Sequence, residues 1–566
     1  MLCGIRLVQI LLTICISLFG SSRTFSDHFD GIDIDEPVER WMKYVLDESS
    51  ATRSLEELLA ENREYLNETR NYDTPKYFTS FNGAKISNTI NSLSVGPYGP
   101  LLMADNVLLE KLGHFVRERI INRVASALGN GAFGYFEVTN PDVDKDSIAD
   151  LFSEPGKRTS IAVRFSLQAA SPGESEVQRT AHSVAIKFYT KDGNWDLLML
   201  NTPVFAIRDS IQVTELFHSF EPDPVNHLRN PNNMWDYLSL QPSSLLQVLF
   251  LKSDMGIPKN WRKMSAWSVD TYEFQDRDGN FAFVRFTLEP KIKVKGYLDD
   301  EEAARISGDD PNHFSRDLWQ AIERGDDPTW LLKYQIIRKK QLDKIEFNPL
   351  DATKIWPVDK YPEIVIGKVV LDENPFNYFA EIEQLAFNPS NVVPGILTTF
   401  DKNLQGRLFA YRDAQNYRLG VNHEKLAVNK PIVKMVNPTF RDGFCADYEN
   451  GGSEPNYFPN SLSGKIRDIP MNTTKSWLYP SHLIKRYDTT RDSNYWQVDM
   501  VWKTYKMDEK QRIAQRTADA LADVDKFIQK RYVNEVGKAN KEYSNMIQEA
   551  LKLNEQKRLE NISMDI

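Results

Sequence analysis

The spacing of hydrophobic and polar residues divides the chain into regions of different expected structure. Residues 25–122 are polar and weakly periodic, with one helical pattern at 55–65, which is typical of an extended arm with little core of its own. Between residues 160 and 371, short apolar runs that alternate with polar positions predict β-strands. The spacing becomes helical again near the end of the chain, from residue 513 onward.

Asp-Gly dipeptides join two pairs of the predicted strands. This dipeptide favours the tight turn of an antiparallel hairpin, so each pair is expected to form one. The two pairs are 185–189 with 195–200 around Asp192-Gly193, and 271–274 with 281–288 around Asp278-Gly279. A further strand is predicted at 363–371, before Pro375.

The last third of the chain combines a long irregular stretch with a helical tail. Residues 374–496 are rich in Pro, Asn and aromatic residues, and so long a stretch is normally functional or wrapped over something. In the tail, apolar residues keep one helical face through Ile528, and Asp508 is a candidate cap at the start. Gly537 is expected to separate a second helix, which includes residues 543–551.

Composition and charge narrow the class of protein. A chain of 566 residues and 65.2 kDa has room for several domains, and its formal net charge of -10 argues against nucleic acid as the main partner. Arg6 precedes an apolar run at 7–19 that is too short to span a bilayer, which favours a secretory signal at 1–22 over an uncleaved anchor. We therefore expect a secreted protein with no membrane span after signal removal.

Cysteine and glycosylation motifs fit this expectation. Two of the three cysteines lie in the signal region, so the mature chain keeps only Cys445 and forms no internal disulfide. Three sequons, which are compatible with a glycosylated product, begin at Asn67, Asn472 and Asn561.

The candidate chemistry lies in the stretch Arg-Leu-Phe-Ala-Tyr-Arg-Asp-Ala-Gln at 407–415. On a helix, Arg407 and Tyr411 share one face, where the cation can hold the phenol as phenolate. A phenolate is a hard anionic oxygen ligand that suits a metal. Spacing alone leaves the alternative that Tyr411 is a half-buried aromatic residue with a polar tip.

This stretch is similar to the haem-ligand signature of the catalase family, with Arg412 where the family usually has proline. Other stretches that carry the resemblance are 117–120, 131–139, 192–197, 201–203 and 374–388. The resemblance implies an α+β fold and a homotetramer. Its expected parts are an N-terminal arm at 23–126, an antiparallel β-barrel at 127–373, a wrapping segment at 374–496 that carries Tyr411, and a C-terminal helical domain at 497–566.

The resemblance also implies a haem site. Tyrosine is the known axial ligand of the haem iron in this family, and Tyr411 matches it. Arg407 matches the arginine that keeps this tyrosine ionised. Three further arginines match those that meet or flank the haem propionates, where permanently charged donors suit two carboxylates; they are Arg123, Arg164 and Arg418.

On the opposite face of the haem, this chain departs from the family. Ser126 stands where the family has the histidine that moves a proton between the peroxide oxygens, and Leu200 stands where it has the distal asparagine. A serine hydroxyl does not ionise near neutral pH, and leucine cannot hydrogen-bond peroxide. Because acid–base help is typically worth about 10²–10⁴ in rate, we expect weak or no catalase activity.

Other positions that differ from the family point the same way. His182 lies near the expected haem entrance and is the one histidine that offers an alternative distal group, although it is also typical of a structural residue. The channel aspartate aligns with Thr180, and a distal phenylalanine aligns with Val213. The His, Arg and Lys that hold a nicotinamide cofactor in some members are replaced, so we do not expect NADPH; the residues here are Leu246, Met255 and Glu289.

Three hypotheses about function therefore remain open. The chain is a full catalase that uses an unconventional distal group such as His182, or a haem enzyme for bulkier organic hydroperoxides. Alternatively, it is a haem-binding or structural protein without enzymatic activity.

Overall fold

The computed structural model describes residues 77–291, 296–437, 439–447, 450–462, 486–489 and 493–564. The expected signal at 1–22, the helical pattern at 55–65 and the sequons at Asn67 and Asn472 lie outside these residues, as does the side chain of Asn561. The described residues fall into two units. One contains 77–122, 417–422 and the described residues of 442–452, and the other contains the described residues of 123–416, 423–441 and 453–564.

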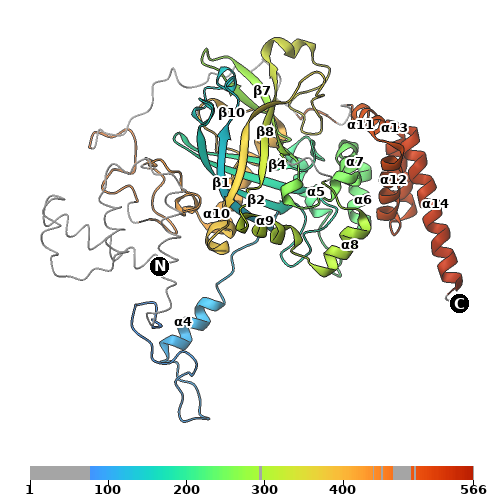
Figure 1. Ribbon diagram of the computed structural model, residues 1–566. Helices are drawn as coiled ribbons and strands as arrows, with labels where there is room; N and C mark the ends of the chain where they lie inside the picture. Colours follow the sequence, from blue (N-terminus) through green and yellow to red (C-terminus); the bar gives the residue numbers. More distant parts are fainter. Residues whose placement is uncertain are drawn as a thin grey trace. The chain divides into compact units, whose positions relative to one another are not determined.

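The larger unit is built on an antiparallel sheet that closes into a barrel (Figure 1). The strands are β1 (Gly129–Val138), β2 (Arg158–Leu167), β3 (His182–Thr190), β4 (Gly193–Leu200), β5 (Ala266–Trp267), β6 (Tyr272–Gln275), β7 (Phe281–Pro290), β8 (Thr329–Arg338), β9 (Ile364–Glu373) and β10 (Ile396–Thr398). In the described chain the order β7-β5-β4-β3-β2-β1-β9-β8 returns to β7, while β6 and β10 extend from it. The predicted α+β fold with an antiparallel barrel is confirmed.

The strand pairing follows the predicted hairpins. β3 pairs with β4 across the first Asp-Gly turn, where Thr190 lies opposite Gly193. β6 pairs with β7 across the second. Gly193 has a φ of 113°, a value that side chains rarely adopt, which is why the turn contains glycine at this position. Both hairpin predictions are confirmed.

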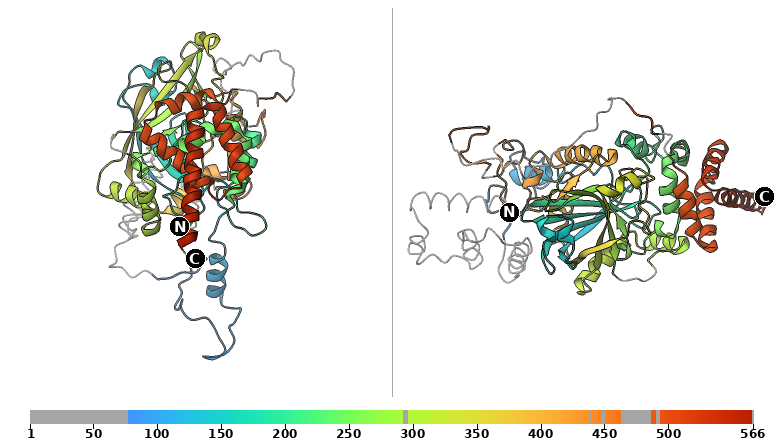
Figure 2. Two further views of the ribbon diagram at one scale, coloured as in Figure 1. Left: turned by 90° about the vertical axis from the view of Figure 1, so that its right-hand side faces the viewer. Right: turned by 90° about the horizontal axis from the view of Figure 1, so that it is seen from above.

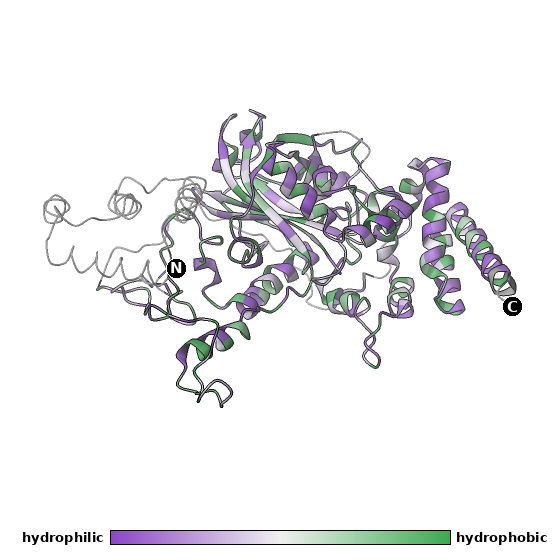
Figure 3. Cartoon of the chain, turned by 60° about the horizontal axis from the view of Figure 1, so that its bottom comes forward, coloured by the Kyte–Doolittle hydropathy of each residue, from purple (hydrophilic) through white to green (hydrophobic). Residues whose placement is uncertain are grey.

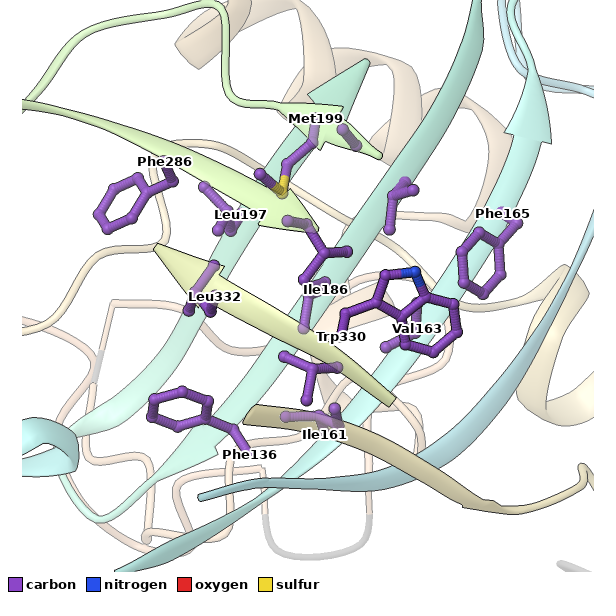
Figure 4. Close-up of a cluster of buried hydrophobic side chains, with 14 of the residues drawn as sticks. Phe136, Ile161, Val163, Phe165, Ile186, Leu197, Met199, Phe286, Trp330 and Leu332 are labelled. Atoms are coloured by element: carbon purple, nitrogen blue, oxygen red, sulfur yellow. The ribbon is translucent and has the colours of Figure 1, made fainter. Parts of the chain in front are cut away.

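Alternate residues of the strands fill the barrel interior (Figure 4). The labelled side chains converge there from several strands, and each is at most 2% exposed: Phe136, Ile161, Val163, Phe165, Ile186, Leu197, Met199, Phe286, Trp330 and Leu332. Burial of one such side chain stabilises the fold by about 1.5–3 kcal/mol. The two-residue periodicity of the strands therefore produces a packed core that can hold the surrounding loops in place.

In sequence order, the helices of the same unit occur between the strands and at the end of the chain (Figures 1 and 2). They are α5 (Val213–His218), α6 (Pro231–Leu240), α7 (Leu245–Lys252), α8 (Asp300–Asp309), α9 (His313–Glu323), α11 (Trp496–Thr504), α12 (Met507–Leu521), α13 (Lys526–Ala539) and α14 (Lys541–Met564). α12 contacts α7, and α13 contacts α6. Figure 3 shows hydrophobic and hydrophilic residues interleaved along the C-terminal helices. Among the described residues, no helix is long and apolar enough to cross a membrane.

The predicted boundary between the tail helices was wrong, whereas the second predicted helix at 543–551 is confirmed within α14. The helix expected to run through Ile528 ends at Leu521, where the Val524 N–H donates to the Leu521 carbonyl at 3.1 Å and closes a turn. Gly537 lies inside α13 rather than between helices. A Cβ at this position would lie 3.2 Å from Ser544 Oγ, so glycine allows α14 to pack closely. Asp508 is in the first turn of α12, and Lys506 is the cap residue.

The smaller unit has almost no core in its described part. Its helix α4 (Asn106–Phe115) begins after Asp105, whose carboxylate accepts a hydrogen bond from the Leu108 N–H at 3.1 Å. Asp105 is the only residue of 77–122 that is buried. The prediction that this region has little core of its own is confirmed for these residues.

The wrapping segment contains regular structure where it was expected to be irregular. It includes a π-helical turn (Phe379–Glu383), β10 and the helix α10 (Lys402–Leu419), which has 18 residues. The hydrophobic pattern of α10 is weak because charged and polar residues occur on all its faces. Its formation depends on contacts at its start, which also position the candidate site.

Candidate functional site

The start of α10 is fixed by a buried cap and by a close contact. Asp401 is fully buried, and its Oδ1 accepts hydrogen bonds from the N–H groups of Asn403 at 2.9 Å and Leu404 at 3.3 Å. Gly406 lies against Ser210, since a Cβ on the glycine would be only 2.2 Å from the serine Cβ. These contacts hold the face of α10 that carries the predicted ligand.

Arg407 and Tyr411 meet on this face as predicted. Arg407 Nη2 donates a hydrogen bond to the Tyr411 hydroxyl oxygen at 3.0 Å. The guanidinium carbon also lies 5.1 Å from the centre of the tyrosine ring. A fixed cation beside the oxygen suits an oxygen ligand of iron, so the geometry of the pair agrees with the predicted role.

Behind Arg407 lies a carboxylate that the sequence analysis missed. Asp270 is fully buried and forms an ion pair with Arg407 Nη1, and its Oδ1 accepts a hydrogen bond from Asn403 Nδ2 at 2.7 Å. Burial alone lowers the pKa of Arg407, but the charges of Asp270 and Tyr411 outweigh this effect and raise the pKa above its ordinary value. No spacing pattern links Asp270 to Arg407, because 137 positions separate them.

The two distal positions come together around a third residue, Ser183. Ser126 Oγ donates to Ser183 Oγ at 3.4 Å, which is a long and weak hydrogen bond. Across β3 and β4, Ser183 is the direct partner of Leu200, and across β2 and β3 it is the partner of Ser166. This group of four residues offers hydroxyls and an aliphatic side chain but no general base.

Arg164 holds the backbone of the distal loop. Its Nη1 donates to the carbonyl of Ser126 at 2.7 Å and its Nη2 to the carbonyl of Ala127 at 3.0 Å. Ser126 has a φ of 63°, in the left-handed region that non-glycine residues rarely adopt. The arginine, which is 3% exposed, therefore supports a strained conformation at this position.

The other two predicted propionate arginines are also largely buried. Arg123 Nη2 donates to the carbonyls at the end of the π-helical turn, which belong to Ile382, Glu383 and Leu385 at 3.0, 2.8 and 2.9 Å. Arg418, near the end of α10, is 6% exposed. The contacts of Arg123, Arg164 and Arg418 with haem propionates stay predictions.

His182 belongs to the hydrophobic core and not to the distal group. It is fully buried, its ring centroid lies 5.6 Å from that of Trp261 and 5.9 Å from that of Phe314, and its Nε2 has no hydrogen-bond partner. Neighbouring residues of a strand point to opposite faces, so His182 points away from the face of Ser183. Burial lowers the pKa of His182 to about 4, which keeps the ring neutral near pH 7.

The positions that differ from the family serve ordinary packing roles in this structure. Leu246 is 3% exposed in a hydrophobic cluster, against which Met255 and Val213 pack. Glu289 forms an ion pair with Lys333. The carbonyl of Thr180 lies 2.9 Å from His182 Nδ1.

The residues present fit a haem group. A phenol held by a fixed arginine supplies the anionic oxygen ligand that ferric iron takes in this family. Two aliphatic residues close in sequence to Ser126 and Ser210 are exposed: Val124 is 85% exposed and Ile211 is 63% exposed. Such exposed apolar surface suits an apolar macrocycle.

Comparison with known proteins shows which families match the chain. Residues 79–464 match the family described as Catalase, and residues 488–551 match the one described as Catalase-related immune-responsive. Among curated relatives, the catalase of Ascaris suum is 41% identical over 491 residues, which cover 86% of this chain and 90% of the relative. Catalase-2 of Caenorhabditis elegans is 40% identical over 482 residues, which cover 85% and 96%.

Solved structures agree with these matches. Catalase A from Saccharomyces cerevisiae aligns with a TM-score of 0.78 and 34% identity, over 84% of this chain and 99% of that one. A fungal catalase aligns with a TM-score of 0.80 and 34% identity, over 86% and 99%. From its sequence, its closed barrel and these relatives, the chain belongs to the catalase family.

Proposed function

We propose that this protein binds haem through Tyr411 and decomposes hydrogen peroxide weakly or not at all. The observation that carries the proposal is the contrast between the two sides of the site. Arg407 donates to the Tyr411 oxygen at 3.0 Å, whereas Ser126, Ser183 and Leu200 provide no general base. The protein thus keeps what holds the cofactor and lacks what moves a proton.

The residues of the chain divide the expected chemistry between them. Bound haem supplies the iron at which peroxide is reduced or oxidised. Arg407 donates a hydrogen bond to the Tyr411 oxygen that would bind the iron, and Arg164 keeps the distal loop in its strained conformation. Peroxide cleavage also needs a proton to be moved from one oxygen to the other, and a serine hydroxyl does not accept a proton near pH 7. The loss of this help corresponds to about 3–5.5 kcal/mol of barrier.

A second candidate function is the turnover of bulkier organic hydroperoxides. Leu200 and Val213 are both aliphatic, and Val213 is smaller than the phenylalanine that the family has at this position. The distal side is therefore more apolar and less filled, which favours an alkyl group over water. A haem-binding role without turnover is the remaining alternative.

We also propose that the protein is secreted and assembles as a homotetramer. The expected signal at 1–22 supports secretion. In the described part of the arm, large apolar residues are exposed, among them Tyr77, Phe81, Tyr98, Met103 and Val116 at 67%, 69%, 100%, 73% and 68%. Exposed apolar surface of this extent normally marks an interaction site, and further copies of the chain are the partners that the family resemblance implies.

The proposed function is tested on the purified protein, expressed with ample haem. We expect the absorption spectrum of a tyrosinate-ligated ferric haem, one haem per chain, and oxygen evolution at least about a hundredfold below that of an unaltered catalase. Turnover of tert-butyl hydroperoxide in place of hydrogen peroxide favours the second candidate. A colourless protein refutes haem binding, and full oxygen evolution refutes the loss of catalase activity.

A further inference from the structure

A strained turn presents Asp270 to the candidate haem site. The Asp270 N–H donates to the Ser268 carbonyl at 2.5 Å, and Ser268 Oγ donates back to the Asp270 carbonyl at 3.0 Å. Val269, at the centre of this three-residue turn, has a φ of 51° and is 2% exposed. A γ-turn with positive φ is rare, and for a β-branched residue it is a real outlier. Such strain persists only where the surroundings enforce it, and it concentrates at functional sites.

The turn and the start of α10 form one rigid group. Asp401 accepts hydrogen bonds from the Thr271 N–H at 3.1 Å and from the Asn403 N–H at 2.9 Å, so the cap residue of α10 also holds the residue after Asp270. Asn403 Nδ2 donates to one oxygen of Asp270, and Arg407 occupies the other oxygen. Both oxygens of the Asp270 carboxylate are therefore engaged, and its orientation toward Arg407 is fixed.

We propose that Asp270 is a positioning residue for the axial tyrosine: its carboxylate holds Arg407 against the Tyr411 oxygen and biases the bound iron toward the ferric state. This inference rests on the proposed haem site. Arg407 has one guanidinium nitrogen on each partner, so the Asp270 contact directs the other nitrogen at the phenol. Without the carboxylate, the guanidinium is free to turn away from Tyr411.

The charge of Asp270 acts in the same direction as its hydrogen bond. Burial and the neighbouring Asp270 charge raise the pKa of Asp401 to about 8. The carboxylate that forms the ion pair with Arg407 is that of Asp270. A fixed anion on the Tyr411 side of a bound haem would stabilise the ferric over the ferrous state. Loss of the anion and loosening of the phenolate both favour the ferrous state, so their effects on the reduction potential add.

The test compares Asp270→Asn with Asp351→Asn in the full-length, haem-loaded protein. Asp351 is also a buried carboxylate, 4% exposed and ion-paired with Arg208 and Lys354 at 3.2 and 3.4 Å, but no hydrogen bond connects it to Arg407. For Asp270→Asn we expect haem transfer to apomyoglobin to be about tenfold faster and the reduction potential to be more positive. For Asp351→Asn we expect a lower melting temperature with both haem readouts unchanged.

A second variant keeps the test informative if Asp270→Asn folds poorly. Asn403→Ala removes one hydrogen bond to Asp270 but keeps the charge, so haem release should accelerate while the potential changes less than in Asp270→Asn. The inference is overturned if Asp270→Asn, or Asn403→Ala in its place, matches the control in haem release and potential. A wild-type protein that takes up no haem instead contradicts the proposed function itself.

Discussion

The two sides of the candidate site contain similar structural features that have different roles. Each side has a largely buried arginine and a non-glycine residue with positive φ. On the side of Tyr411, called the proximal side below, these are Arg407 and Val269. On the distal side they are Arg164 and Ser126. Arg407 binds two side chains, whereas Arg164 binds two backbone carbonyls. The proximal side therefore arranges charge, and the distal side arranges only backbone shape.

This difference shows that a buried arginine can hold a strained backbone at a position that carries no acid–base group. The distal loop still adopts a strained conformation, which costs of order 1–3 kcal/mol, although Ser126 provides no acid–base function in return. The strain survives because Arg164 and the strand pairing of β2 with β3 enforce it. The following predictions test whether the proximal charge and the distal shape act independently.

The largest effect is expected from Tyr411→Phe. Phenylalanine offers no oxygen to iron, so the variant should lose its haem or hold it loosely with an altered spectrum. The measurement is haem content per chain together with the visible absorption spectrum. Tyr417→Phe is a matched control on the same helix, because Tyr417 is 74% exposed. An unchanged spectrum in Tyr411→Phe would show that the axial assignment is wrong.

A large gain is expected from repair of the distal side. Ser126→His introduces the histidine that moves a proton in the family, and Leu200→Asn introduces an amide that can hydrogen-bond peroxide. The distal loop is already held by Arg164. Oxygen evolution per haem should rise, up to about 10²-fold, and should exceed the sum of the single changes because both groups act on one peroxide.

Recovery in the double variant should be partial. The pocket still differs from the family at Thr180 and Val213, and a distal base must lie within hydrogen-bond reach of the peroxide. Both single variants serve as controls. A fully haem-loaded double variant without added turnover would locate the defect in peroxide access and not in the two distal groups.

More of the fold than of the candidate site could be predicted from the sequence. The barrel hairpins followed from alternation and Asp-Gly turns, and the contact between Arg407 and Tyr411 followed from a four-residue spacing, because both depend on residues close in sequence. Asp270 and Ser183 were not predicted as site residues, since strand pairing and loop packing bring them to the site from distant positions. Only the folded backbone shows their roles.

A moderate loss of stability is expected from Arg164→Lys. Arg164 spans two carbonyls with its forked guanidinium, and an ammonium group cannot reproduce both hydrogen bonds. Release of the strained loop at Ser126 should lower the free energy of unfolding by about 1.5–3 kcal/mol, measured by urea denaturation. Arg158→Lys on the same strand is the control, because Arg158 is 57% exposed in a surface ion pair and should change stability little. Equal effects of the two changes would argue against a special role of Arg164.

The smallest effect near neutral pH, and the sharpest test of the distal assignment, is expected from His182→Phe. The His182 ring packs against Trp261 and Phe314 without a partner for Nε2, so an aromatic replacement keeps most of the packing. At pH 7 both oxygen evolution and stability should stay close to those of the wild type.

At acidic pH, the stabilities of the wild type and His182→Phe should differ. The pKa of His182 is about 4 in the folded chain and about 6.5 when unfolded, so the unfolded state binds the extra proton between these values. The wild type should therefore lose up to about 3 kcal/mol of stability as pH falls from 6.5 to 4, and His182→Phe should lose less. Urea denaturation of both proteins across this range measures the difference. If His182→Phe instead abolished residual peroxide turnover at pH 7, His182 would be the unconventional distal group, and the contrast between the two sides would fail, because the distal side would then contain a general base.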